Sequence, residues 1–189
     1  MIDYGSLFTA LCDLVRASGS PQHAWATVLD ETERHGALPP ELRAWDAGED
    51  VARLRGEVSA VLAREPIPPG IGFIYFGLFE AWDEETDDPV AGFYIAGGPK
   101  DDPALALAEA RLPYFPESRH FISPLLDAIH ATPERGDYDP TLMRYALEFG
   151  AAALLAKHAT AGLLDGYELI VGFDDGDRAM IREPNKGDG

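Results

Sequence analysis

The sequence contains a single cysteine, so no disulfide can form within the chain. It also lacks any uninterrupted apolar run of roughly 18 residues, the length that a helix needs to cross a bilayer. Its first residues, Met1-Ile2-Asp3-Tyr4, do not show the basic start and apolar stretch of a secretory signal. Together these absences predict a protein without transmembrane segments that is cytoplasmic, or that is exported by a route without an N-terminal signature.

Basic residues are scarce: 15 Lys and Arg stand against 33 Asp and Glu, a formal net charge of -18 over 189 residues. A surface this negative repels nucleic-acid phosphates and anionic membranes, so neither is expected as a partner. It attracts basic proteins and accelerates their association. Because acidic residues also keep proteins soluble, the charge leaves two interpretations open, a basic protein partner or solubility alone.

Motifs for catalysis and for cofactor binding are absent as well. No serine lies in a Gly-x-Ser-x-Gly elbow, and the five histidines show no His-Glu-x-x-His pattern, so zinc is not expected. Asp83, Glu85 and Asp87 alternate like the start of a calcium loop, but Asp88 stands where that loop needs glycine. The sequence therefore predicts no catalytic residue and no cofactor, and leaves open only a weak divalent-ion site in this loop.

What the chain does have is a well-patterned core, with 46% hydrophobic residues. Residues 1–65 are predicted to be helical, because apolar residues recur there at three- and four-residue spacing. Several Ser-Pro or Asp-Pro pairs, and one Asp three residues before a Glu, are typical helix starts. The predicted starts are Ser20-Pro21, Asp46, Asp102-Pro103, Ser123-Pro124 and Asp139-Pro140, the last helix running to about His158.

Two segments are typical of β-hairpins. Residues 71–82 are apolar on both alternating faces, which indicates a central strand, and residues 90–96 are its predicted partner. Residues 167–173 and 178–182 form the second predicted hairpin. We therefore expect the α+β class, with an antiparallel sheet built from two hairpins (about 71–96 and 167–182) packed against helices.

The predicted organisation is one α+β domain over residues 1–183. It comprises a helical region (1–65) followed by the sheet with its helices (70–183). The polar residues 184–189 are expected to be a disordered tail.

Many of the acidic residues lie at the two predicted hairpin turns. If both turns point the same way, they form one negative edge that could contact a basic protein, with the tryptophan before the first turn as an aromatic anchor. If the turns point in different directions, these acidic residues are there only because tight turns favour aspartate. The candidate partner-binding residues are Trp82, Asp83, Glu84, Glu85, Asp87 and Asp88 in the first hairpin, and Asp174, Asp175 and Asp177 in the second.

In size and acidity, though in no motif, the chain is similar to the small acidic immunity proteins of bacteria, which neutralise a cognate toxin. That similarity implies a non-enzymatic binding protein that occupies a basic surface of its partner. Two alternatives remain open: a regulatory or scaffold module with an apolar interface, and a carboxylate-dependent hydrolase. The sequence does not determine the oligomeric state.

Overall fold

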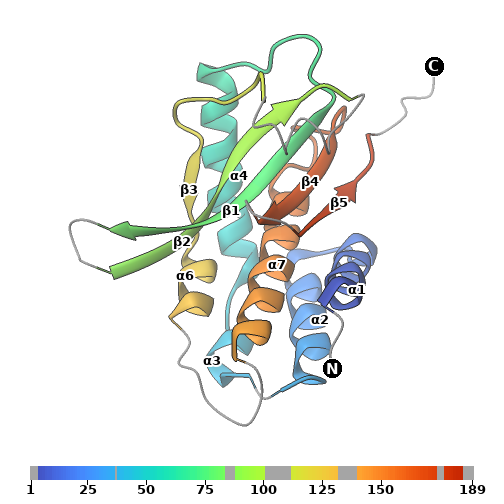
Figure 1. Cartoon of the computed structure of the whole chain (residues 1–189), viewed down its shortest axis with the longest axis vertical. Helices are drawn as coiled ribbons and strands as arrows, with labels where there is room; N and C mark the ends of the chain where they lie inside the picture. The colour runs from blue at the N-terminus through green and yellow to red at the C-terminus, as the bar shows by residue number, and fades with distance from the viewer. Residues whose placement is uncertain are drawn as a thin grey trace.

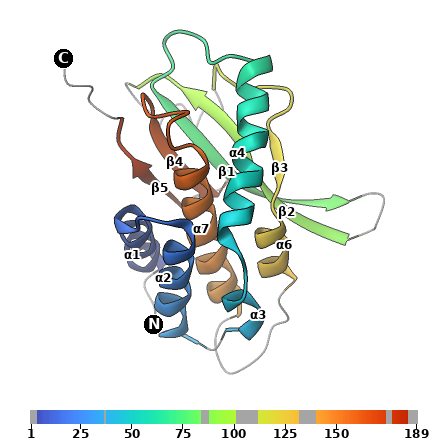
Figure 2. The same cartoon turned by 180° about the vertical axis from the view of Figure 1, so that it is seen from behind.

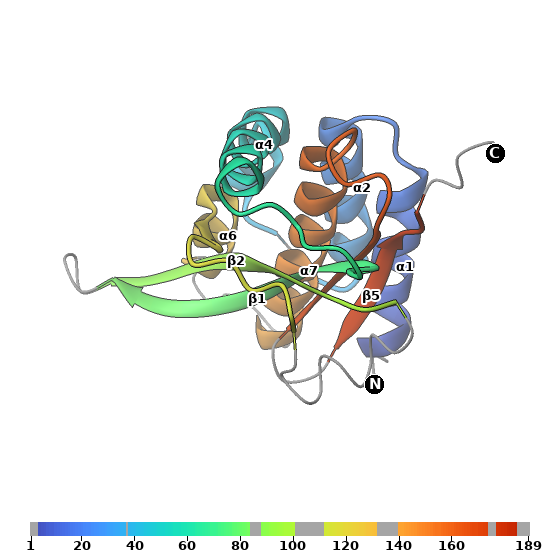
Figure 3. The same cartoon turned by 90° about the horizontal axis from the view of Figure 1, so that it is seen from above.

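The protein consists of two layers, a five-stranded sheet and a set of helices on one of its faces (Figure 3). The structure, a computed structural model, describes residues 4–36, 38–83, 88–100, 112–131, 140–173 and 177–184. The described helices are α1 (Tyr4–Ala17), α2 (Pro21–Glu33), α3 (Pro40–Arg43), α4 (Ala47–Arg64), α6 (Pro124–His130) and α7 (Pro140–Ala159). The strands are β1 (Phe73–Asp83), β2 (Asp88–Gly98), β3 (His120–Ile122), β4 (Glu168–Phe173) and β5 (Arg178–Arg182).

Three of the predicted helix starts are confirmed by their capping hydrogen bonds. The hydroxyl of Ser20 accepts from the backbone N–H of residue 23, and that of Ser123 from the N–H of residue 126, each at 3.3 Å. The carboxylate of Asp46 accepts from the N–H groups of residues 48 and 49. These side chains satisfy donors that a helix leaves free at its first turn. The helix predicted after Asp102-Pro103 lies outside the described residues.

The prediction of a purely antiparallel sheet is wrong. The strand order is β3-β2-β1-β4-β5, and the two predicted hairpins meet through β1 and β4, which run parallel from Phe73↔Glu168 to Leu78↔Phe173. The sheet is therefore mixed. A parallel pair needs a long crossover between its strands, and the helices α6 and α7 lie in that connection. The sequence analysis also missed the short edge strand β3, which pairs with β2.

The core lies between the sheet and the helices, with α7 at its centre. Figure 2 shows α7 flanked by the other long helices, and it packs against α1, α2, α4 and α6 as well as against β4. Residues 146–156 of α7 are all buried, which explains why this helix is nearly apolar all round. None of the described helices is both long and apolar enough to cross a membrane.

The single cysteine is part of this core. Cys12 is fully buried, and burial raises the pKa of its thiol to about 12. The thiol is therefore neutral at physiological pH and packs as a small apolar group.

Two helical glycines give a matched test of this packing. A Cβ added at Gly150 in α7 would lie 2.6 Å from Cγ1 of Val28 in α2, whereas nothing lies within 4 Å of a Cβ at the exposed Gly56 in α4. We expect Gly150→Ala to destabilise the protein by about 1–3 kcal/mol through overpacking. Gly56→Ala should stabilise it by up to about 1 kcal/mol, because alanine has the higher helix propensity.

Urea unfolding of the two variants measures the difference. If Gly150→Ala stabilises the protein as much as Gly56→Ala does, then α2 and α7 are not in the close contact described here.

Candidate functional site

The two strands that lead into the acidic segments, β1 and β4, end on the same side of the sheet. Because β1 and β4 are parallel, their C-terminal ends point in the same direction, and each is followed by its acidic turn. Asp83 and Asp88 are direct partners across the first hairpin. Asp177 is exposed just before β5, and its carbonyl accepts a hydrogen bond from the N–H of Phe173 at the end of β4.

The rest of the predicted acidic edge is described only in part. The backbone of Trp82 pairs with Pro89 near the end of the first hairpin. The other five candidate residues lie outside the described part of the chain: Glu84, Glu85, Asp87, Asp174 and Asp175.

The first hairpin extends well beyond its neighbours in the sheet. β4 pairs with β1 only as far as Leu78, and β3 pairs with β2 only over Gly92–Tyr94. The segment Phe79–Asp83 of β1 therefore has only β2 beside it among the described strands, and Figure 1 shows the hairpin projecting from the body. At roughly 3.3 Å per residue this arm is about 16 Å long. The C-terminal ends of β1 and β4 thus point the same way, and the end of β1 lies well beyond the end of β4.

A cluster of charged side chains lies at the base of this arm. Glu80 comes from β1, His130 from the end of α6, and Arg144 and Glu148 from α7. Nδ1 of His130 is 3.5 Å from Oε1 of Glu80 and 3.5 Å from Oε1 of Glu148. The guanidinium of Arg144 is 3.8 Å from the same two carboxylate oxygens. The fold therefore brings together two carboxylates, Glu80 and Glu148, that are far apart in the sequence.

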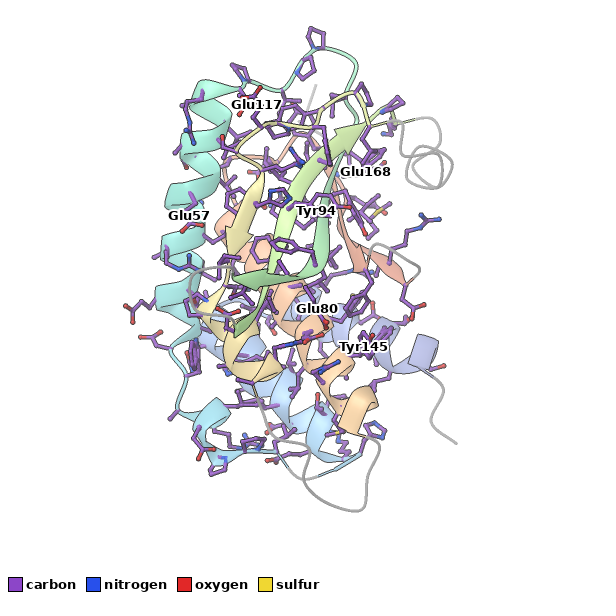
Figure 4. The ribbon with its side chains drawn as sticks, turned by 60° about the vertical axis from the view of Figure 1, so that its left-hand side comes forward. Glu57, Glu80, Tyr94, Glu117, Tyr145 and Glu168 are labelled. Carbon is purple, nitrogen blue, oxygen red and sulfur yellow. The ribbon has the colours of Figure 1, made fainter. Side chains whose placement is uncertain are left out.

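Local structure explains why these side chains converge. Along β1, Ile74, Phe76 and Leu78 face the helices, so the next residue of that series, Glu80, faces them too. Arg144 and Glu148 are four residues apart and share one face of α7. Figure 4 shows Glu80 beside Tyr145 of α7, with Glu57 of α4 and Glu117 well away from them.

Burial sets the electrostatics of the cluster. The side chain of Glu148 is 4% exposed, that of His130 11% and that of Glu80 52%. Burial raises the pKa of Glu148 to about 7, with the nearby Arg144 opposing this shift and Glu80 adding to it. At neutral pH this carboxyl is therefore divided between its charged and neutral forms.

A cavity of about 200 Å³ opens next to the two carboxylates. Its walls come from β1, β2 and β4 and from α6 and α7. They comprise Leu78, Phe79, Glu80, Ala91, Leu126, Tyr145, Glu148 and Phe173. The rings of Tyr145 and Phe173 meet edge to face with their centroids 5.0 Å apart. The site combines apolar walls with a few converging polar groups, which is the usual composition of a ligand-binding pocket.

No motif in the sequence predicted this cluster, although one residue of α7 indicated a polar site. Glu148 is the only charged residue between Tyr145 and Ala156, in a helix that the pattern places in the core. A buried carboxylate needs a partner, so its isolation in that run indicates a polar site nearby. Nothing in the sequence pointed to Glu80 or His130 as that partner.

Comparison with known proteins adds no further guide to function, since no protein-family description, no curated protein and no solved structure matches this chain.

Proposed function

We propose that this chain is a binding protein whose acidic sheet end occupies a basic surface of a protein partner, as an immunity protein does with its toxin. The observation that supports the proposal is the parallel pairing of β1 with β4, because it sets the strand ends that precede both acidic segments on the same side of the sheet. Acid gathered on one side steers a basic partner toward that side, whereas acid spread evenly does not.

The shape of the projecting hairpin also suits the proposed binding to a partner. A narrow arm that extends beyond the sheet can enter a cleft, which a flat sheet edge cannot do. Its end is held by two strands in register from Phe73↔Gly98 to Asp83↔Asp88, so little ordering is needed on binding. A basic cleft is what proteins that cleave nucleic acids present to phosphates, and an acidic arm is complementary to it.

The test uses the protein encoded beside this chain's gene, purified as an inactive variant, as the binding partner. Association is measured by stopped flow at low and at high salt. We expect association to slow steeply as salt rises, and Asp83→Lys with Asp177→Lys to slow it by about tenfold or more at low salt.

A matched control changes the net charge equally elsewhere. Glu57→Lys with Glu117→Lys places the same two reversals on α4 and in the segment before β3, which Figure 4 shows apart from Glu80 at the base of the arm. This double variant should alter the association rate by no more than about twofold, because the attraction between charges falls with their distance from the docking surface. Equal effects of the two double variants, or an association rate that salt does not change, would contradict the proposal.

A further inference from the structure

The cluster at the base of the arm contains buried polar atoms that no hydrogen bond satisfies. Among the described residues, neither Nδ1 of His130 nor Oε1 of Glu148 has a hydrogen-bond partner. Their separation is 3.5 Å, longer than the 2.7–3.2 Å typical of N–H···O bonds. The side chain of Glu148 is almost fully buried, and its oxygen points into the cluster instead of toward solvent. Buried polar atoms in this state call for a further group between them.

The spacing of these atoms suits a metal ion. Oxygen and nitrogen ligands bind Zn²⁺ at about 2.0–2.2 Å, so two ligands of a tetrahedral site lie about 3.4 Å apart. The distance from Nδ1 of His130 to each carboxylate oxygen is 3.5 Å. One ligand atom from each of Glu80, His130 and Glu148 lies within 4.8 Å of the others. All three can therefore bind one ion with little movement.

We infer that Glu80, His130 and Glu148 form a binding site for a divalent transition metal of the zinc class. One imidazole with two carboxylates suits such an ion, whereas Mg²⁺ and Ca²⁺ sites are built from oxygen ligands. Three protein ligands leave one position of a tetrahedral ion open, and Glu80 and Glu148 both line the cavity. The inference does not depend on the proposed partner.

Arg144 is the group in the cluster that most opposes metal binding. Its guanidinium is 3.8 Å from the oxygens of both carboxylates, so its positive charge competes with an incoming cation. Neither contact is short enough for a hydrogen bond, and Nε of Arg144 has no hydrogen-bond partner among the described residues. The side chain is 32% exposed and can withdraw toward solvent. Arg144 therefore weakens the site without filling it.

The experiment titrates Zn²⁺ into the untagged, chelator-treated chain by calorimetry and records the visible absorption of the Co²⁺ complex. We expect one ion per chain, with a dissociation constant in the micromolar range or below. His130→Gln and Glu148→Gln should each weaken binding by about tenfold or more, since each removes a ligand. His23→Gln and Glu57→Gln, which remove the same groups elsewhere, should change it by less than about twofold.

Arg144→Gln keeps the test decisive even if a ligand variant folds poorly. It removes the competing positive charge and should tighten Zn²⁺ binding severalfold, a gain that misfolding cannot produce. The inference is overturned if the chain binds no Zn²⁺, or if His130→Gln and Glu148→Gln, folded by circular dichroism, bind it as the parent does. It is also overturned if Arg144→Gln leaves the affinity unchanged. Association with the protein partner is measured in a separate experiment. The metal titration therefore does not test the proposed partner binding, and the association measurement does not test the metal site.

Discussion

Replacing Phe149 by alanine is expected to lower the free energy of unfolding by about 3–5 kcal/mol, the usual range for removing a buried phenylalanine. Phe149 is fully buried in α7, next to Glu148. Its ring stacks on Phe8 of α1 at a centroid distance of 4.8 Å and lies 5.9 Å from the ring of Phe173 in β4. The substitution therefore loosens a helix–helix and a helix–sheet contact together.

Urea unfolding at constant m-value measures this loss. Phe115→Ala is the control, since Phe115 is 50% exposed and lies in the segment before β3, away from α7. It should cost less than about 1 kcal/mol, as surface substitutions usually do. Comparable losses for the two variants would mean that α7 does not join α1 to the sheet as described.

The helices and the hairpin strands could be predicted because their signals are local. A serine followed by proline both caps a helix and fixes its first turn, so Ser20 and Ser123 mark the starts of α2 and α6 without reference to the rest of the chain. The apolar residues on both faces of the segment that contains β1 indicated a central strand, and β1 lies in the middle of the sheet.

The parallel pairing of β1 with β4 could not be predicted in the same way. Phe73 pairs with Glu168, and the partners are separated by about half of the chain. Nothing in either strand selects the other, because any apolar strand can pair on both edges. The choice depends on how the intervening helices cover the sheet, which is a property of the assembled layers.

The charged cluster was hidden for a related reason. Glu80, His130 and Glu148 come from three elements and form no short motif, so spacing along the chain carries no information about their approach. The acidic turns drew attention because their charge is contiguous in the sequence. Tertiary structure relates the two features: the cluster stands where the arm that carries the first acidic turn leaves the sheet.

Lys157→Met is expected to destabilise the protein by about 3 kcal/mol, because this ammonium group closes the end of another helix. Nζ of Lys157, in the last turn of α7, donates hydrogen bonds to the backbone carbonyls of Val15 at 2.7 Å, Arg16 at 2.8 Å and Ser18 at 2.7 Å. The carbonyls of Val15 and Arg16 lie in the last turn of α1 and that of Ser18 just beyond it, where a helix leaves acceptors without intrahelical partners. The carbonyl of Val15 also accepts from the N–H of Ser18. Hydrogen bonds to charged groups contribute about 1.5–3 kcal/mol each, and the carbonyls regain part of this from water.

The geometry of this contact also predicts that arginine replaces Lys157 only in part. An ammonium group directs three N–H bonds to three converging acceptors, whereas the planar guanidinium of arginine spreads its donors in a fork. Lys157→Arg should therefore recover only part of the stability. Lys100→Met is the matched control, since Lys100 is exposed and its ion pair with Glu168 is long, at 3.7 Å, and it should cost less than about 1 kcal/mol. Because the carbonyls are dipoles held in contact, the Lys157→Met deficit should persist in about 1 M salt, which screens exposed ion pairs. A deficit that disappears in salt would show that Lys157 acts through distant charges and not as a cap on α1.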